Sequence, residues 1–166
     1  PKFSFVIPHR GTDRKPVLEA TIRSIGALQG EVECIVVEQD QKSVLGDLPG
    51  NSRHIHAPNA CGDERWNKCF AFNEGVRQAR GEIIVCHDGD LVVPSGYLDV
   101  IEHHLVSNGD VVAFPQRFLF YLSQDSTAAL LKRWSSQTLR QQTPETIKQT
   151  WVGGTLAITR DAYWGI

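Results

Sequence analysis

The sequence predicts an α/β fold built on an open, mostly parallel, twisted sheet flanked by helices. The first forty residues alternate strand, helix and strand, a pattern that favours parallel pairing. Residues 83–86 form a short, wholly apolar run closely preceded by Gly81, which is typical of a central strand buried on both faces. The 166 residues are enough for one domain with a sizeable core.

The N-terminal half is predicted to form three strands and two helices before that central strand. In chain order these are a strand over 3–7, a helix over about 16–28, strands over 33–37 and 53–57, and a helix over about 63–80. Pro8 ends the first strand, Pro16 suits a first helical turn, and Asp63 is the expected N-cap of the second helix. Cys69 is expected on the inward face of that helix.

The C-terminal half is predicted to continue the same alternation less regularly. Its elements are a helix over about 94–108, a strand over 111–114, an apolar run over 118–122, a helix over 127–134 and a strand over 155–159. Leu98, Ile101 and Leu105 are expected to face the core. The segment 135–150 is rich in Gln and Thr without an apolar period, so we expect part of it to be loosely held.

Composition bounds the classes of function. Apolar content of 41% and charged content of 22% are ordinary for a globular chain, and the net charge of −2 gives no basic footprint for nucleic acid. No apolar stretch reaches the ~18 residues of a membrane span. The four cysteines include no CxxC pair, which argues against a zinc or redox motif. These features predict a cytoplasmic protein, either free or peripheral to a membrane.

Asp88-Gly89-Asp90 is the strongest candidate site in the chain. Two carboxylates follow directly on a buried strand, where they need a positive partner. They could give one cation two oxygen ligands, and a cation held this way is usually shared with phosphates. The alternative is an ordinary Asp-Gly turn. The preceding strand favours a site, because open α/β sheets bind ligands beyond the carboxyl ends of their strands.

Polar residues also follow the first two predicted strands. His9 and Arg10 come after strand 3–7, where Arg10 could reach a phosphate or pair with Asp13 instead. Glu38 and Asp40 come after strand 33–37, and either is a binding acid or part of a solvated turn.

The order of these motifs resembles the family 2 nucleotide-sugar glycosyltransferases of the GT-A type, which have a Rossmann-like sheet. The matching motifs are Val6-Ile7-Pro8, Glu38-Gln39-Asp40, Asn73-Glu74-Gly75, residues 81–84 and Asp88-Gly89-Asp90. Each motif is weak alone, whereas five in the right order are a strong signal.

A closer likeness is to the β-1,4-galactosyltransferase and polypeptide N-acetylgalactosaminyltransferase branches. Pro8-His9-Arg10 resembles their Pro-Phe-Arg loop and Trp66-Asn67-Lys68 their Phe-Asn-Arg. Residues 88–94 resemble Asp-Val-Asp-Leu-Ile-Pro with one residue more, and residues 151–154 resemble Tyr-Phe-Gly-Gly. His9 in place of an aromatic ring and Lys68 in place of an arginine are departures from those branches.

The resemblance implies metal-dependent transfer of a sugar from a UDP-sugar to an acceptor hydroxyl, with inversion at the anomeric carbon. Asp88 and Asp90 would hold Mn²⁺ or Mg²⁺. The expected nucleotide-sugar-binding residues are Pro8, His9, Arg10, Glu38, Asp40, Lys68, Asp88, Gly89, Asp90, Gly153 and Gly154. The acceptor, whether carbohydrate, lipid-linked or protein, is not defined.

Several of these residues have a plain structural alternative. His9 could lie against the uracil ring or fill a polar loop, and Lys68 could be an exposed helix lysine. Gly153 and Gly154 could let the backbone approach the sugar or form a bulge. Trp66 is expected to pack rather than take part in chemistry.

At the level of the whole chain, we expect residues 1–166 to be a single GT-A domain truncated in its acceptor part, with the catalytic base beyond Ile166. A non-catalytic nucleotide-sugar-binding domain and a sugar nucleotidyltransferase are the alternative functions. The second alternative fits poorly, because the loop after the first strand has one glycine rather than a glycine-rich basic sequence.

Overall fold

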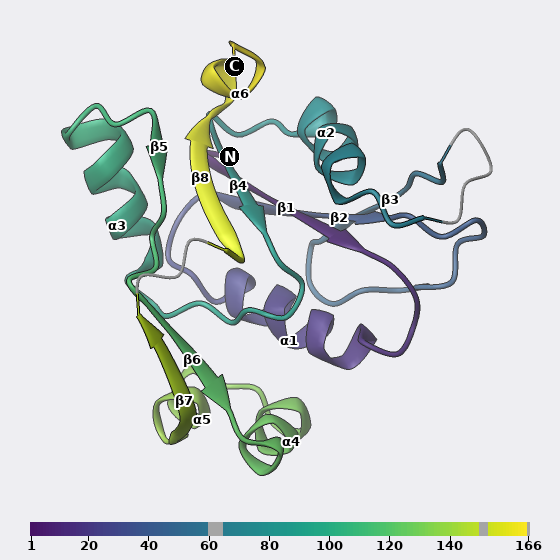
Figure 1. The fold of residues 1–166 in the computed structure, drawn as a ribbon, viewed down its shortest axis with the longest axis vertical. Coiled ribbons are helices and arrows are strands. Elements are labelled where there is room, and N and C mark those ends of the chain that lie inside the picture. Colours follow the sequence, from purple (N-terminus) through teal and green to yellow (C-terminus); the bar gives the residue numbers. More distant parts are fainter. Residues whose placement is uncertain (60–64, 150–152, 166) are drawn as a thin grey trace.

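The computed structural model describes residues 1–59, 65–149 and 153–165 and contains a six-stranded, mostly parallel sheet (Figure 1). In spatial order its strands are β3 (Arg53–His56), β2 (Val32–Glu38), β1 (Phe3–His9), β4 (Ile83–His87), β8 (Thr155–Thr159) and β5 (Val112–Ala113). The first four are parallel, and β8 runs antiparallel to both β4 and β5. The predicted α/β class and the central place of the first, second and 83–86 strands are confirmed.

Helices cover both faces of this sheet and divide the core in two. On one face, α1 (Lys15–Gly26) and α3 (Tyr97–Glu102) pack against alternate residues of the central strands, including Phe5, Ile7 and Val85. On the other face, α2 (Lys68–Gln78) and α6 (Arg160–Gly165) pack on the intervening residues, such as Val6 and Ile84. A π-helical turn, η1 (His103–Ser107), extends α3.

The predicted core positions of the α3 segment are confirmed. Leu98, Ile101 and Leu105 are all buried. The two cysteines inside strands, Cys34 and Cys86, are buried as well, whereas Cys69 is exposed and the prediction of an inward Cys69 is wrong. The inward residues of α2 are Ala71, Gly75 and Val76.

The second predicted helix begins later than expected, at Lys68, because Asn67 rather than Asp63 caps it. The Asn67 side-chain oxygen accepts a hydrogen bond from the Phe70 amide at 3.0 Å, which satisfies one of the free amides of the first turn. Asp63 itself lies outside the described residues.

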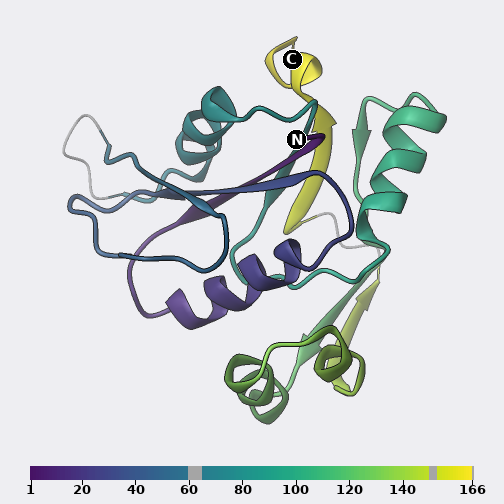
Figure 2. The same ribbon diagram turned by 180° about the vertical axis from the view of Figure 1, so that it is seen from behind.

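A small lobe, which lies between β5 and β8 in the sequence, stands apart from the main sheet (Figures 1 and 2). It consists of an antiparallel pair, β6 (Phe118–Leu122) and β7 (Pro144–Gln149), and of the helices α4 (Gln124–Lys132) and α5 (Ser136–Arg140). The polar segment predicted to be partly loose contains a helix and a strand over its described residues, 135–149. Pairing with the apolar β6 supplies the order that its own composition does not. None of the helices described is long and apolar enough to cross a membrane.

Candidate functional site

A pocket of about 340 Å³ opens at the carboxyl ends of β1 and β4. It is lined by Pro8, His9, Arg10, Arg14, Trp66, Lys68, Asp88, Gly89 and Asp90. Seven of these nine were expected from the sequence, and they come from three separate stretches. The parallel pairing of β1 with β4 brings the first and third stretches to one edge of the sheet.

The acidic turn is held against α1 by its glycine. A Cβ atom on Gly89 would lie 3.4 Å from both Ile7 Cγ2 and Leu18 Cδ1, so the backbone passes close to the core at this point. The hydroxyl of Thr21 on α1 donates to the Gly89 carbonyl at 3.1 Å. These contacts fix the turn and place Asp88 and Asp90 at the pocket wall.

Each carboxylate of the turn is paired with a basic side chain. Lys68 Nζ forms an ion pair with Asp88 Oδ1, and Arg14 Nη2 lies 2.9 Å from Asp90 Oδ2. Arg14 was not expected from the sequence. Its only signal there is its place just before the first helix, next to the loop that follows β1.

The loop after β1 is braced by His9 and Asp40. The His9 ring is buried and its Nε2 donates to the Gly11 carbonyl at 2.9 Å, while burial lowers the pKa of the ring. Asp40 Oδ2 accepts from the Gly11 amide at 2.7 Å, and Asp40 Oδ1 lies 3.8 Å from Arg10 Nε. Arg10 is therefore presented at the pocket from a loop fixed at both sides.

Glu38 and Asp40 have different surroundings. Glu38 is fully buried and outside the pocket lining, and its carboxylate accepts hydrogen bonds from the Val44 and Leu45 amides, the Ser43 hydroxyl and His54. It anchors the loop after β2. Asp40 is only partly buried and touches the loop that carries Arg10.

Gln39, which lies between these acids, has a positioning role that the sequence does not predict. Its side chain is buried and both donates to the Asn67 carbonyl at 3.1 Å and accepts from the Asn67 amide at 2.7 Å. Because Lys68 follows Asn67, Gln39 sets the point where α2 begins and hence where Lys68 stands. The sequence offers no local signal for this contact across 28 positions.

Gly154 contacts the acidic turn through its backbone. The Asp88 amide donates to the Gly154 carbonyl at 2.7 Å. Gly154 has φ +92°, and a Cβ there would lie 2.6 Å from Leu91 Cδ1. The Gln116 side chain donates to the Gly153 and Thr155 carbonyls at 2.9 and 3.1 Å. The Gly154 backbone therefore passes close to Leu91 and Asp88, and the approach of a sugar to Gly153 and Gly154 stays a prediction.

Trp66 departs from its expected packing role. Its side chain is 43% exposed and lies in the pocket wall. Trp66 therefore shares the pocket lining with Lys68, Asp88 and Asp90.

The residues present fit a divalent cation only as a two-carboxylate site. In the part of the chain that the structure describes, no three His, Cys, Asp or Glu side chains are placed to hold a metal ion together. Asp88 and Asp90 give hard oxygen ligands, and a cation with one or two protein carboxylates completes its shell with water and phosphate oxygens.

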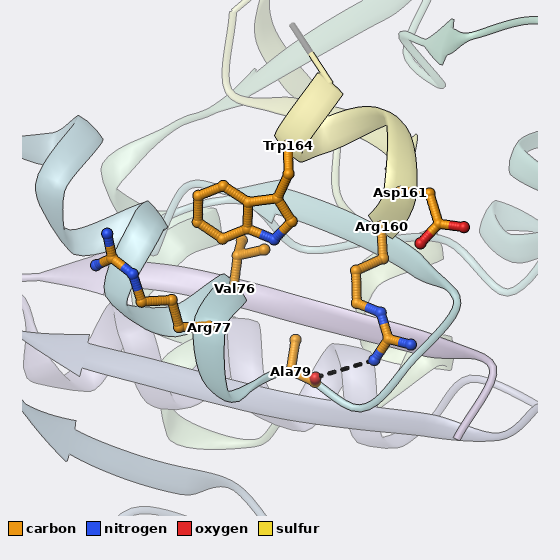
Figure 3. Close-up of a pocket in the computed structure, with 6 residues that line it drawn as sticks. All are labelled: Val76, Arg77, Ala79, Arg160, Asp161 and Trp164. Atoms are coloured by element: carbon orange, nitrogen blue, oxygen red, sulfur yellow. Dashed lines mark hydrogen bonds between the residues drawn. The ribbon is translucent and has the colours of Figure 1, made fainter.

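A second pocket, of about 440 Å³, lies at the other end of β4, between α2 and α6 (Figure 3). The Arg160 guanidinium donates to the Ala79 carbonyl at 3.4 Å, and the Arg77 guanidinium carbon lies 5.7 Å from the Trp164 ring centre. Arg77 is also paired with Glu74. None of the residues expected from the sequence to bind the donor lines this pocket.

The fold and its acidic turn define a GT-A-like α/β domain. Residues 4–166 match the sequence model of the family described as Glycosyl transferase family 2. The chain belongs to this family. No curated protein sequence matches it.

Solved structures agree with the fold. A mannosyltransferase from Pyrobaculum calidifontis in complex with GDP-Man and Mn²⁺ superposes with a TM-score of 0.56 at 15% identity, over 97% of this chain and 45% of that one. Glucosyl-3-phosphoglycerate synthase from Mycobacterium tuberculosis, in complex with Mn²⁺, UDP-glucose and phosphoglyceric acid, gives 0.55 at 18% identity, over 96% and 57%.

A nucleotidyltransferase also has a similar fold. CMP:2-keto-3-deoxy-manno-octonic acid synthetase complexed with CTP gives a TM-score of 0.56 at 14% identity, over 99% of this chain and 77% of that one. At these identities the likeness concerns the fold alone. The chain spans about half the length of the two transferases above.

Proposed function

We propose that this chain carries the donor site of a metal-dependent glycosyltransferase, which moves a sugar from a UDP-sugar to an acceptor hydroxyl with inversion. The observation that carries the proposal is the convergence of Asp88, Asp90, Lys68 and Arg10 on one pocket at the carboxyl ends of β1 and β4. An acidic pair beside basic side chains suits a diphosphate held through a cation.

Asp88 and Asp90 would hold Mn²⁺ or Mg²⁺, which when bound supplies positive charge for the departing diphosphate. Lys68, Arg10 and Arg14 stand within the same pocket and would bind phosphate oxygens directly. Trp66 offers a ring for the base to stack on, and Asp40 is better placed than Glu38 to meet the nucleoside, since Glu38 is committed to its own loop. The likeness to the galactosyltransferase and N-acetylgalactosaminyltransferase branches stays a prediction.

Titration calorimetry with UDP tests this donor site. We expect UDP to bind well with Mn²⁺ and only weakly in EDTA, because two carboxylates repel a diphosphate unless a cation lies between them. Asp88→Asn should weaken Mn²⁺-dependent binding at least about tenfold. Asp99→Asn, on the exposed part of α3, is the matched control and should change nothing. Equal UDP affinity in Mn²⁺ and EDTA would contradict the proposal.

Release of UDP from a UDP-sugar separates a transferase from a binding domain. A nucleotidyltransferase is the second candidate, because the CTP-bound synthetase has a similar fold. Exchange of pyrophosphate into CTP or UTP identifies it. The loop over residues 9–14 has a single glycine, so we expect no such exchange.

A further inference from the structure

The lobe carries an exposed aromatic face that the donor site does not use. Phe118 and Phe120 on β6 and Ile147 on β7 are 42%, 55% and 55% exposed. Phe120 is paired directly with Ile147, and Phe118 stands two residues before Phe120, so the three side chains share one face of the hairpin. The two phenyl rings lie 6.3 Å apart.

Elsewhere in the lobe, a large apolar side chain is buried rather than exposed. Helix α4 packs beside β6, and its Leu130 is buried. Adjacent large apolar side chains left exposed on a strand pair are typical of an interaction surface, whereas single exposed apolar residues are normal. We call Phe118, Phe120 and Ile147 the hairpin face.

The lobe also differs from the rest of the chain in charge. Residues 115–149 contain five basic residues and two acidic ones, a net charge of +3, whereas the whole chain carries −2, leaving −5 on the remainder. All five basic residues are exposed: Arg117, Lys132, Arg133, Arg140 and Lys148. The Arg117 guanidinium lies 5.5 Å from the Phe118 ring centre, which places a positive group directly at the hairpin face.

We propose that the hairpin face docks on an anionic membrane surface. Phenyl rings and an aliphatic side chain would enter the boundary between headgroups and acyl chains, while Arg117 beside Phe118 and the net positive charge of the lobe would attract anionic headgroups. A symmetric contact between two copies is disfavoured, because it would bring two lobes of net +3 together. The lobe stands clear of the six-stranded sheet in both views, so the sheet does not obstruct the approach (Figures 1 and 2).

Docking there would also fix the donor pocket relative to the membrane. The Gln116 side chain, two residues before β6, donates hydrogen bonds to the Gly153 and Thr155 carbonyls. The Gly154 carbonyl in turn accepts a hydrogen bond from the Asp88 amide. The base of the hairpin is thus joined to the pocket wall through two hydrogen-bonded steps. The docking itself does not depend on the proposed transferase activity.

Flotation of the chain with vesicles tests the proposal. We expect the chain to float with vesicles made of equal parts of phosphatidylserine and phosphatidylcholine. It should not float with vesicles of phosphatidylcholine alone. Phe120→Ser should reduce binding about tenfold, while Val106→Ser, on η1 and somewhat more exposed at 62%, should not. Arg117→Glu, at the Phe118 ring, should reduce binding by about fivefold or more, while Lys42→Glu, exposed in the loop after β2, should have a smaller effect.

A tryptophan variant keeps the test valid if Phe120→Ser is poorly folded. Phe120→Trp preserves an aromatic side chain, and brominated lipids should quench its added fluorescence, whereas they should not quench that of Val106→Trp. Absence of flotation, equal binding of Phe120→Ser and Val106→Ser, or equal binding to both vesicle types would overturn the proposal. So would a dimer in analytical ultracentrifugation that Phe120→Ser dissolves.

Discussion

Lys68 at the start of α2 forms an ion pair with Asp88 at the end of β4, twenty residues further along the chain. With Arg14 on Asp90, this pair neutralises both carboxylates of the acidic turn within the protein itself. A cation entering the turn must compete with Lys68 and Arg14 for the same oxygens. The two basic side chains are then available for the phosphates of the ligand that shares the cation.

Lys68→Ala should therefore change metal and nucleotide binding in opposite directions. Mn²⁺ affinity of the nucleotide-free chain should rise about twofold to fivefold, because a partly exposed ion pair is worth at most about 1 kcal/mol. UDP affinity at saturating Mn²⁺ should fall, since a phosphate partner is lost. Electron paramagnetic resonance of free Mn²⁺ and calorimetry with UDP measure the two effects.

Arg77→Ala is the control for Lys68→Ala. Arg77 is also ion-paired on α2, with Glu74, but lies outside the donor pocket. The Mn²⁺ and UDP affinities of Arg77→Ala should equal those of the wild type. If Lys68→Ala weakens Mn²⁺ binding instead, the lysine supports the cation site and the competition described above does not exist.

Gly154→Ala should destabilise the protein by about 1–3 kcal/mol and disturb the acidic turn. Part of this cost is the positive φ of +92°, and part is the approach of the new Cβ to Leu91. Gly46→Ala isolates the first part, because Gly46 has φ +61° with no atom near its Cβ position. Thermal unfolding should rank wild type above Gly46→Ala above Gly154→Ala. Equal losses of thermal stability in the two variants would mean that the Leu91 side chain moves aside without an energetic cost.

Gly75→Ala should destabilise by about 1–3 kcal/mol for a different reason. Gly75 lies in a helix, and a Cβ there would be 2.3 Å from Val6 Cγ1 and 2.9 Å from Val37 Cγ2. The residue lets α2 pack directly on β1 and β2, which holds Lys68 above the strand ends. Gly26→Ala in α1 meets no neighbour within 4 Å and should be neutral or slightly stabilising in a urea titration. A neutral Gly75→Ala would show that α2 shifts without loss.

The parts of the fold that follow from local patterns could be predicted from the sequence. The apolar runs of β1, β2 and β4 and the inward residues of α3 are such patterns, and so is the acidic turn after β4. β7 could not be found in this way, because its polar sequence becomes a strand only by pairing with β6. The beginning of α2 depends on Gln39, which is distant in the sequence.

The candidate site, like the fold, could be predicted only in part from the sequence. The motifs identified seven of the nine pocket residues, because residues after parallel strands meet at one edge. They did not distinguish Glu38 from Asp40, since the difference lies in how the loop over residues 43–45 folds onto Glu38. They also did not reveal that Lys68 and Arg14 pair with the two aspartates, which requires the tertiary arrangement.

Glu38 carries the last prediction, which concerns pH. Burial acts to raise its pKa, but the hydrogen bonds from Val44, Ser43, Leu45 and His54 outweigh burial and hold the pKa below its usual value. A lowered folded pKa means that the carboxylate stabilises the fold above its unfolded pKa of about 4.3 and loses this contribution as pH falls through the lower folded value. Glu38→Gln should cost about 2–3 kcal/mol at pH 7, since several charge-assisted hydrogen bonds are lost.

The free energy of unfolding of Glu38→Gln should therefore approach that of the wild type as the pH falls below about 4.3. Urea titrations at several pH values measure this convergence. Glu102→Gln is the matched control, because Glu102 forms only a surface pair with Lys2 and should cost little at any pH. A constant difference between Glu38→Gln and the wild type down to pH values below the folded pKa would show that the loop is held by packing, with the charge of Glu38 making no contribution.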